Sequence, residues 1–152
     1  MKIREERAGE TGVIRRLLVG VFGRETEADL VDALRAEGVV AQALVAEDAG
    51  EIIGFLMLSR LEGPFPACAL APLAVDPLWQ RHGIGTALIG AMETECDAVF
   101  VLGDPDYYGR FGFRADLAAG YACAFAGPYF LVRPHADIPA TGQIFYPRAF
   151  AH

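Results

Sequence analysis

The sequence has few cysteines, few basic residues and no long hydrophobic run. Its three cysteines, Cys68, Cys96 and Cys123, form no CxxC pair and no cluster with histidine, which argues against a zinc site or any other metal site. An odd number of widely spaced cysteines is typical of a reducing compartment, so we expect a cytoplasmic protein. No stretch approaches the roughly 18 apolar residues of a membrane-spanning helix, and the charged residues 1–6 do not resemble a signal peptide.

Basic residues are outnumbered, with 13 Lys and Arg against 20 Asp and Glu, a net charge of -7 and a pI near 4.9. This balance argues against a nucleic-acid-binding protein, which is usually basic. The length of 152 residues and the hydrophobic fraction of 53% are instead those of a single folded domain, which we place at residues 1–152.

Hydrophobic spacing and glycine positions predict a mixed α/β (α+β) order of elements. Strands are expected at residues 2–6, 41–47, 52–60, 68–75 and 98–102, with less regular ones at 122–125, 129–132 and 143–150. Helices are expected at residues 13–21, 26–37 and 83–95, and a short one after Asp104 and Pro105. Residues 68–75 are nearly all apolar, which is typical of a strand buried on both faces.

The segment from Leu73 to Thr86 contains the residues that suggest a binding site for phosphate. A buried strand leads into a turn, and Gly83 and Gly85 open a helix. The first N–H groups of a helix have no internal partner and attract phosphate, and glycine lets an anion approach the backbone. The same glycines could serve only tight packing of a helix on a strand. The dinucleotide pattern GxGxxG is incomplete because Leu88 takes the third position, and no GxxxxGK[ST] occurs.

Two motifs resemble the GCN5-related N-acetyltransferase (GNAT) family. Residues 80–85, QRHGIG, match its pyrophosphate-binding pattern [QR]xxGx[GA], and residues 108–113, YGRFGF, resemble its Yx3GF segment. The wider runs PLAVDPLWQRHGIG and VFVLGDPDYYGRFGF resemble a bacterial subgroup described as YhbS-like predicted acetyltransferases. The resemblance implies a mostly antiparallel sheet flanked by helices, with splayed central strands.

The resemblance also implies a reaction and its residues. Acetyl-CoA would donate an acetyl group to an amine that attacks the thioester directly. The pantetheine arm would pair with Leu73, Ala74 and Val75, and the pyrophosphate would bind the loop. The loop residues that the motif identifies are Gln80, Arg81, His82, Gly83, Ile84, Gly85 and Thr86. Tyr108 would protonate the leaving thiolate, with the adjacent Tyr107 as a substitute, because a phenol stays protonated at neutral pH.

Several alternatives stay open at the level of sequence. The chain could be a non-catalytic sensor that binds acyl-CoA, or a nucleotide-binding enzyme that uses Gly83 and Gly85 for NAD or ATP. Glu47, Asp76 and Asp104 are candidate bases, and each carboxylate could instead be structural. The acceptor, a small-molecule or protein amine, is not specified. The aromatic residues of the last third could form core or cover a homodimer interface.

Overall fold

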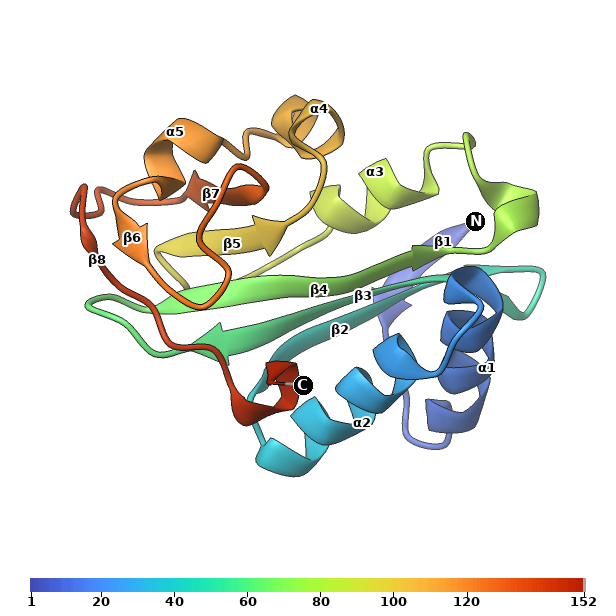
Figure 1. Ribbon diagram of the computed structural model, residues 1–152. Helices are drawn as coiled ribbons and strands as arrows, with labels where there is room; N and C mark the ends of the chain where they lie inside the picture. The colour runs from blue at the N-terminus through green and yellow to red at the C-terminus, as the bar shows by residue number, and fades with distance from the viewer. Residues whose placement is uncertain (152) are drawn as a thin grey trace. The chain divides into compact units, whose positions relative to one another are not determined.

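The computed structural model describes residues 1–151 and shows an α+β fold (Figure 1). Six strands form one sheet in the order β1-β2-β3-β4-β5-β7, and β6 and β8 form a second, two-stranded sheet. The strands are β1 (Lys2–Glu5), β2 (Val40–Asp48), β3 (Glu51–Leu61), β4 (Ala67–Val75), β5 (Ala98–Leu102), β6 (Tyr121–Ala122), β7 (Phe130–Pro134) and β8 (Gly142–Gln143). The helices are α1 (Thr11–Phe22), α2 (Thr26–Glu37), α3 (Ile84–Gly90), α4 (Pro105–Tyr108) and α5 (Ala115–Ala118).

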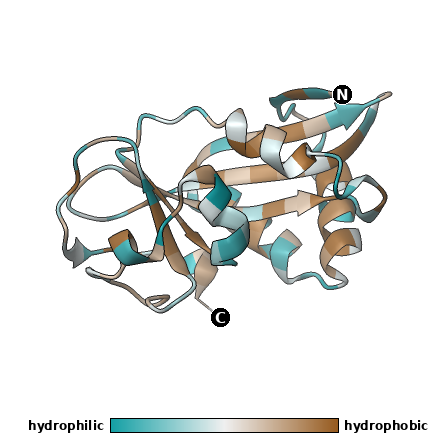
Figure 2. Ribbon diagram, turned by 90° about the horizontal axis from the view of Figure 1, so that it is seen from above, coloured by the Kyte–Doolittle hydropathy of each residue, from teal (hydrophilic) through white to brown (hydrophobic). Residues whose placement is uncertain are grey.

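Contacts divide the chain into two compact units, which we describe separately. The first unit comprises residues 1–57 and 72–93, and the second comprises residues 58–71 and those from 94 on. Strands β3 and β4 contribute residues to both units. Figure 2 shows that the strands are mainly hydrophobic, whereas hydrophilic residues are frequent in the helices and loops.

The core of the first unit forms between helices and strands. Helix α1 buries Ile14 and Leu18, and α2 buries Ala28, Val31 and Leu34, at the spacing expected of amphipathic helices. Both helices end at a glycine in the left-handed conformation, Gly23 with φ 67° and Gly38 with φ 69°. The sequence predicts the bounds of α2, and its range for α1, residues 13–21, is two residues short at the start and one at the end.

Helix α3 lies close to strand β3 because residue 54 is glycine. A Cβ at Gly54 would come within 3.0 Å of Ile84 Cγ2 and 3.1 Å of Leu88 Cδ1. A larger residue would push these two buried side chains, and therefore α3, away from the strand. Gly54 thus fixes the position of the helix that follows the candidate phosphate loop.

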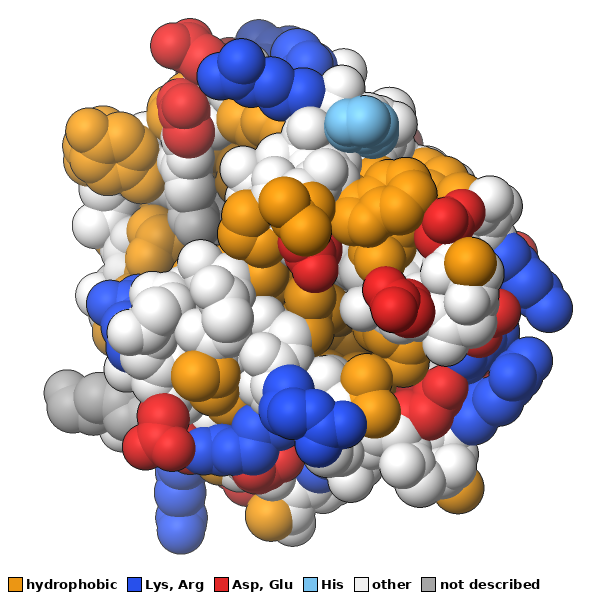
Figure 3. Space-filling view, turned by 90° about the vertical axis from the view of Figure 1, so that its right-hand side faces the viewer, with side chains coloured by type: hydrophobic (Ala, Val, Ile, Leu, Met, Phe, Trp, Pro, Cys, Tyr) orange, Lys and Arg blue, Asp and Glu red, His pale blue; other side chains and the backbone are white. Residues whose placement is uncertain are grey.

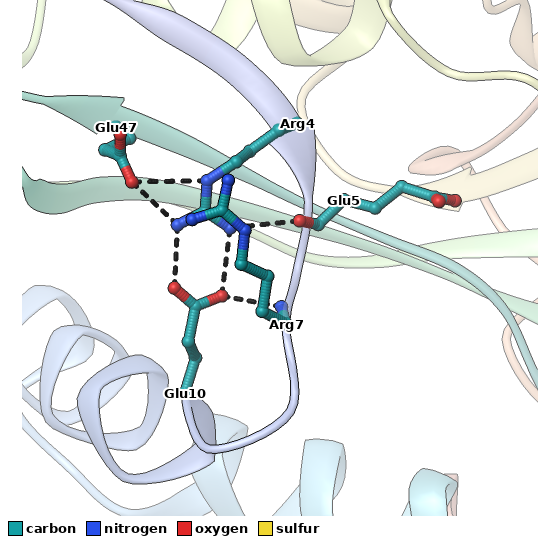
Figure 4. Close-up of polar contacts among 5 residues, drawn as sticks. All are labelled: Arg4, Glu5, Arg7, Glu10 and Glu47. Carbon is teal, nitrogen blue, oxygen red and sulfur yellow. Dashed lines mark hydrogen bonds and ion pairs between the residues drawn. The ribbon is translucent and has the colours of Figure 1, made fainter.

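An ion-pair network around Arg4 joins β1, β2 and the start of α1 (Figure 4). The Arg4 guanidinium donates to both Glu10 carboxylate oxygens, at 3.0 and 2.7 Å, and to Glu47 Oε1 at 2.7 Å. The Arg4 side chain is only 9% exposed. These hydrogen bonds lower the pKa of the Glu10 carboxyl to about 2 and also lower the pKa of Glu47.

We expect Glu10→Gln to destabilise the protein at neutral pH and not at strongly acidic pH. The Glu10 pKa is lower in the folded state than its ordinary value of 4.5. The ion pair therefore stabilises the fold above pH 4.5, and this contribution is lost as the pH falls through about 2. Urea unfolding of both proteins from pH 7 to pH 2 measures the difference.

The exposed Glu51 offers the matched control, because Glu51→Gln makes the same chemical change at the turn between β2 and β3. Its unfolding free energy is expected to stay within about 0.5 kcal/mol of the wild type at neutral pH. If the Glu10→Gln protein is as stable as the wild type at pH 7, the ion pair between Arg4 and Glu10 does not contribute to the unfolding free energy.

Strands β4 and β5 are parallel and pair over only part of their length. Their register runs from Ala67 opposite Ala98 to Ala69 opposite Phe100. Strand β5 continues to Leu102 without extending this register, while it pairs along its whole length with antiparallel β7, from Ala98 opposite Pro134 to Leu102 opposite Phe130. This early end of the β4–β5 pairing agrees with the splayed central strands that the resemblance implies.

Aromatic residues form the core of the second unit. The Phe100 ring stacks with Phe130 at 5.2 Å between centroids and meets the edge of Tyr121 at 5.4 Å. Phe125, Tyr146 and Phe150 pack against the same core. Tyr129 and Phe145 are 60% and 52% exposed. Most of the aromatic residues in the last third therefore serve the core.

The cysteines do not behave as expected for a protein of a reducing compartment. Cys68 and Cys96 form a disulfide, with their Cα atoms 6.3 Å apart, and Cys123 is free. The parallel pairing explains the proximity: Ala67 lies opposite Ala98, so the residues just before β5 return to the start of β4. A separation of 28 residues gives no sign of this pairing in the sequence.

Several predicted boundaries were wrong. The helix expected at residues 83–95 ends at Gly90, and the Glu93 N–H donates instead to the Gln42 side chain at 2.9 Å. The strands expected at 122–125 and 143–150 are reduced to the short β6 and β8. In their place Phe125 N–H turns back to Cys123 Sγ at 3.3 Å, and residues 148–150 form a 3₁₀ turn after Pro147.

Charged side chains are dispersed. On the face drawn in Figure 3, acidic and basic side chains lie in several small groups, often next to each other, with hydrophobic side chains between the groups. No helix within residues 1–151 is long and apolar enough to cross a membrane. Within the same residues, no group of three or more His, Cys, Asp and Glu side chains could hold a metal ion.

Candidate functional site

The loop between β4 and α3 is a tight, exposed turn in the first unit. Asp76 caps a single 3₁₀ turn, η1 (Pro77–Trp79), by accepting from Leu78 N–H at 2.9 Å. Arg81 and Gly83 both have left-handed backbones, with φ 68° and 77°. Gly83 adopts this conformation without a steric penalty, whereas Arg81 is an unusual residue there. Two such residues reverse the chain sharply before α3.

The start of α3 presents free N–H groups. The first backbone hydrogen bond of this helix is donated by Ala87 N–H to Gly83 O, at 3.0 Å. The N–H groups of Ile84, Gly85 and Thr86 therefore have no carbonyl partner within the helix. Gly85 is buried and Arg81 is exposed beside it in the loop. Donors without partners next to a basic side chain fit a pyrophosphate group.

Gln80 holds the loop against the end of β4. Its side-chain amide donates to Val75 O at 3.2 Å. Asp76 N–H donates to Ile53 O of β3 at 2.8 Å. Because the backbone groups of successive strand residues point to opposite edges, those of Leu73 and Val75 point away from β3 and those of Ala74 point toward it. The backbone groups of Leu73 and the N–H of Val75 could thus pair with an extended ligand, whereas Val75 O already accepts from Gln80.

Trp79 and His82 contact each other across the loop, with ring centroids 5.8 Å apart in an edge-to-face arrangement. His82 is exposed, and no protein group within residues 1–151 hydrogen-bonds to its ring. Among the sequence-predicted loop residues, Gln80 therefore has a structural contact, and the main-chain groups after Gly83 remain available.

A cleft of about 450 Å³ lies beside the start of this loop. It is lined by the first turns of α1, including Arg16, by the turn between β2 and β3, and by Asp76. Asp76 thus belongs to the cleft and also caps η1. Glu10, Glu51 and Asp76 are the acidic residues of the lining, and Arg16 is the basic one.

Tyr108 lies in the second unit, at the end of α4. Asp104 caps this helix by accepting from Asp106 N–H at 2.9 Å, and Tyr108 N–H donates to Asp104 O at 2.9 Å. The Tyr108 ring meets Tyr107 and Phe113 edge-on, at 5.0 and 5.8 Å between centroids. The Arg110 guanidinium lies over the Tyr107 ring, 4.9 Å from its centroid.

The Tyr108 hydroxyl is available for a ligand. Within residues 1–151 no protein group hydrogen-bonds to it, whereas the Tyr121 hydroxyl donates to Pro139 O. Burial raises the pKa of Tyr108 to about 12, and the neighbouring Tyr107 acts in the same direction. Burial also raises the pKa of Tyr107, against the effect of Arg110. Tyr108 therefore keeps its proton throughout the neutral range.

The three candidate bases all have structural contacts. Glu47 is paired with Arg4, at 2.7 Å, and its pKa is lowered, which weakens it as a base. Asp76 and Asp104 accept from backbone N–H groups as helix caps. The structural alternative for each of these carboxylates therefore has direct support.

Residues 40–115 of the chain match the acetyltransferase (GNAT) domain family. The chain is 33% identical over 136 residues to an uncharacterized N-acetyltransferase, YhbS, of Escherichia coli strain K12. This match covers 84% of this chain and 81% of that protein. It is also 36% identical over 114 residues to a second uncharacterized E. coli N-acetyltransferase, YjhQ, over 66% of this chain and 62% of that protein.

Solved structures resemble nearly the whole chain. The crystal structure of E. coli YhbS in complex with CoA has a TM-score of 0.87 and 30% identity, over 99% of this chain and 92% of that one. A GNAT family acetyltransferase from Brucella melitensis in complex with acetyl-CoA has a TM-score of 0.78 and 30% identity, over 98% and 97% of the two chains. With this fold and these relatives, the chain belongs to the GNAT family of N-acetyltransferases, enzymes of class EC 2.3.1.

Proposed function

We propose that the protein transfers an acetyl group from acetyl-CoA to an amine. The main support for the proposal is the loop of residues 80–86, where the family's pyrophosphate motif coincides with the N–H groups of Ile84, Gly85 and Thr86, which have no hydrogen-bond partner within residues 1–151. The two relatives that were crystallised with CoA or acetyl-CoA each match nearly the whole chain. We also propose that residues 1–152 act as one domain, since the family match includes parts of both units.

In this proposal each part of the chain has one task. The N–H groups after Gly83 and the Arg81 side chain bind the pyrophosphate. The backbone groups of Leu73 and the N–H of Val75 hold the pantetheine arm. The acceptor amine attacks the thioester carbonyl, the C–S bond breaks, and Tyr108 gives its phenolic proton to the departing thiolate. The proton lost by the amine restores the phenol through solvent, so no covalent acyl-enzyme is needed.

The proposal is tested by thermal unfolding of dialysed protein with acetyl-CoA, CoA, NAD or ATP. A ligand at about 100 times its Kd adds about 2.7 kcal/mol to the unfolding free energy. For a chain of this size the midpoint should rise by about 5–10 °C. We expect a rise with acetyl-CoA and CoA only. A rise with NAD or ATP alone would favour a different nucleotide-binding protein.

A second assay separates an enzyme from an acyl-CoA sensor. We would measure release of free CoA thiol from acetyl-CoA in the presence of a panel of small amines and lysine peptides. Amine-dependent release supports the transferase. Tight acetyl-CoA binding without release from any amine in the panel would favour the non-catalytic sensor.

A further inference from the structure

Gly103 lies directly against the ring of Tyr108. Gly103 is the first residue after β5, and Tyr108 is the last residue of α4. A Cβ at position 103 would lie 2.5 Å from Cε2 and 2.9 Å from Cδ2 of the Tyr108 ring. Carbon atoms in contact prefer separations of about 3.5–4.0 Å. The ring therefore occupies the space that any other side chain at position 103 would need.

The glycine is needed for space and not for backbone conformation. Gly103 does not have a left-handed φ, unlike Gly112, whose φ is 88°. Its N–H donates to Tyr129 O at 2.9 Å, as an ordinary residue could. Gly103 has no positive φ that would exclude alanine, and the three atoms nearest to an added Cβ all belong to the Tyr108 ring.

The ring has little freedom to move away from a new methyl group. Tyr107 and Phe113 meet it edge-on, and Phe113 is itself buried. Two hydrogen bonds fix the backbone of Tyr108. Its N–H donates to Asp104 O at 2.9 Å, and its carbonyl accepts from Phe113 N–H at 3.3 Å. Gly103 and these aromatic neighbours together determine where the hydroxyl points.

We propose that Gly103 is a positioning residue for the proton donor Tyr108, which it holds by leaving room for the ring to lie against the backbone. This inference rests on the proposed function. In the step concerned, the O–H bond of Tyr108 breaks and an S–H bond forms on the CoA thiolate. Such a transfer requires close alignment, and a displacement of about 1 Å can lower a rate by about 10²-fold.

Gly103→Ala tests the proposal. We expect kcat to fall by about 10–10²-fold with an unchanged KM for acetyl-CoA. In a Tyr108→Phe background the same change should lower kcat less than about threefold further, since two residues that act through one group are not additive. The control is Gly109→Ala in the adjacent turn, where φ is -58° and a Cβ would meet nothing within 4 Å.

A second measurement is independent of activity. In protein with ¹³C-labelled tyrosine rings, the Tyr108 NMR signal is identified by its loss in Tyr108→Phe. It should move in Gly103→Ala and stay in place in Gly109→Ala, because the ring shifts relative to Tyr107 and Phe113 only in the first variant. If Gly103→Ala does not fold, the double variant with Tyr108→Ala removes the obstructing ring and should restore folding.

An unmoved Tyr108 signal, or an equal loss of kcat in the Tyr108→Phe background, would overturn the role of Gly103. If Tyr108→Ala alone folds, failure of the double variant to fold would overturn it as well, since the obstacle would then not be the ring. Absence of CoA release from the wild type would instead count against the proposed function, while the NMR signal would still decide whether Gly103 sets the ring position.

Discussion

Tyr108→Phe is expected to lower kcat by about 10²–10⁴-fold, the usual contribution of a general acid. The substitution removes only the hydroxyl, which has no hydrogen-bond partner within residues 1–151, so folding and packing against Tyr107 and Phe113 should persist. Acetyl-CoA should still raise the unfolding midpoint as it does in the wild type. The measurement is CoA release at saturating acetyl-CoA, paired with the thermal shift.

Tyr107→Phe is the matched control, because it removes the same atom from the neighbouring ring of the same helix. It should keep kcat within a few-fold of the wild type. A large loss in Tyr107→Phe with none in Tyr108→Phe would assign the proton transfer to Tyr107.

The pH dependence provides a further check on Tyr108. Its pKa is raised to about 12, so the phenol that donates the proton persists until the solution becomes strongly alkaline. Deprotonation of Tyr108 should therefore not lower the wild-type kcat between pH 7 and 10. Any decrease of kcat in this range should also be present in Tyr108→Phe. A loss near pH 8 confined to the wild type would indicate a donor with a much lower pKa.

The second large effect is expected for Gly85→Glu, which should abolish the thermal shift with acetyl-CoA and CoA. Residue 85 lies between two of the N–H groups that the pyrophosphate needs, so a carboxylate here adds a like charge near the pyrophosphate, and like charges brought together cost several kcal/mol. A loss of about 3 kcal/mol already weakens binding by more than 10²-fold. Isothermal titration with CoA measures the loss directly.

Gly90→Glu provides the control for charge and for helix content. Gly90 ends the same helix and is exposed, and a Cβ at this position would meet nothing within 4 Å. This variant should bind CoA as the wild type does. Circular dichroism establishes whether Gly85→Glu is folded, since Gly85 is buried.

Arg81→Glu is a second variant that keeps the packing intact. Arg81 is exposed, and exchanging it for another residue with a side chain leaves the left-handed backbone as strained as before. It should weaken CoA binding about tenfold or more. Full binding by both Gly85→Glu and Arg81→Glu would show that the loop does not hold the pyrophosphate.

Sequence by itself determined the elements with strong local patterns. Hydrophobic spacing and glycine positions predicted α1 and α2, and they also predicted the strands β2 and β3. The family and the candidate loop also followed from sequence, because a phosphate loop depends on a few neighbouring residues. These features rest on interactions between residues that are close along the chain.

Only the tertiary structure decided the features that depend on contacts between residues far apart in the sequence. Cys68 meets Cys96 because β4 and β5 run parallel, and the end of α3 is displaced by contacts that its own sequence does not contain. The Glu47 carboxylate is paired with Arg4. The Tyr108 ring packs against Gly103, on the other side of a turn, because this residue has no side chain. Local pattern assigns a residue to an element, whereas packing between elements decides which side chains are left free for chemistry.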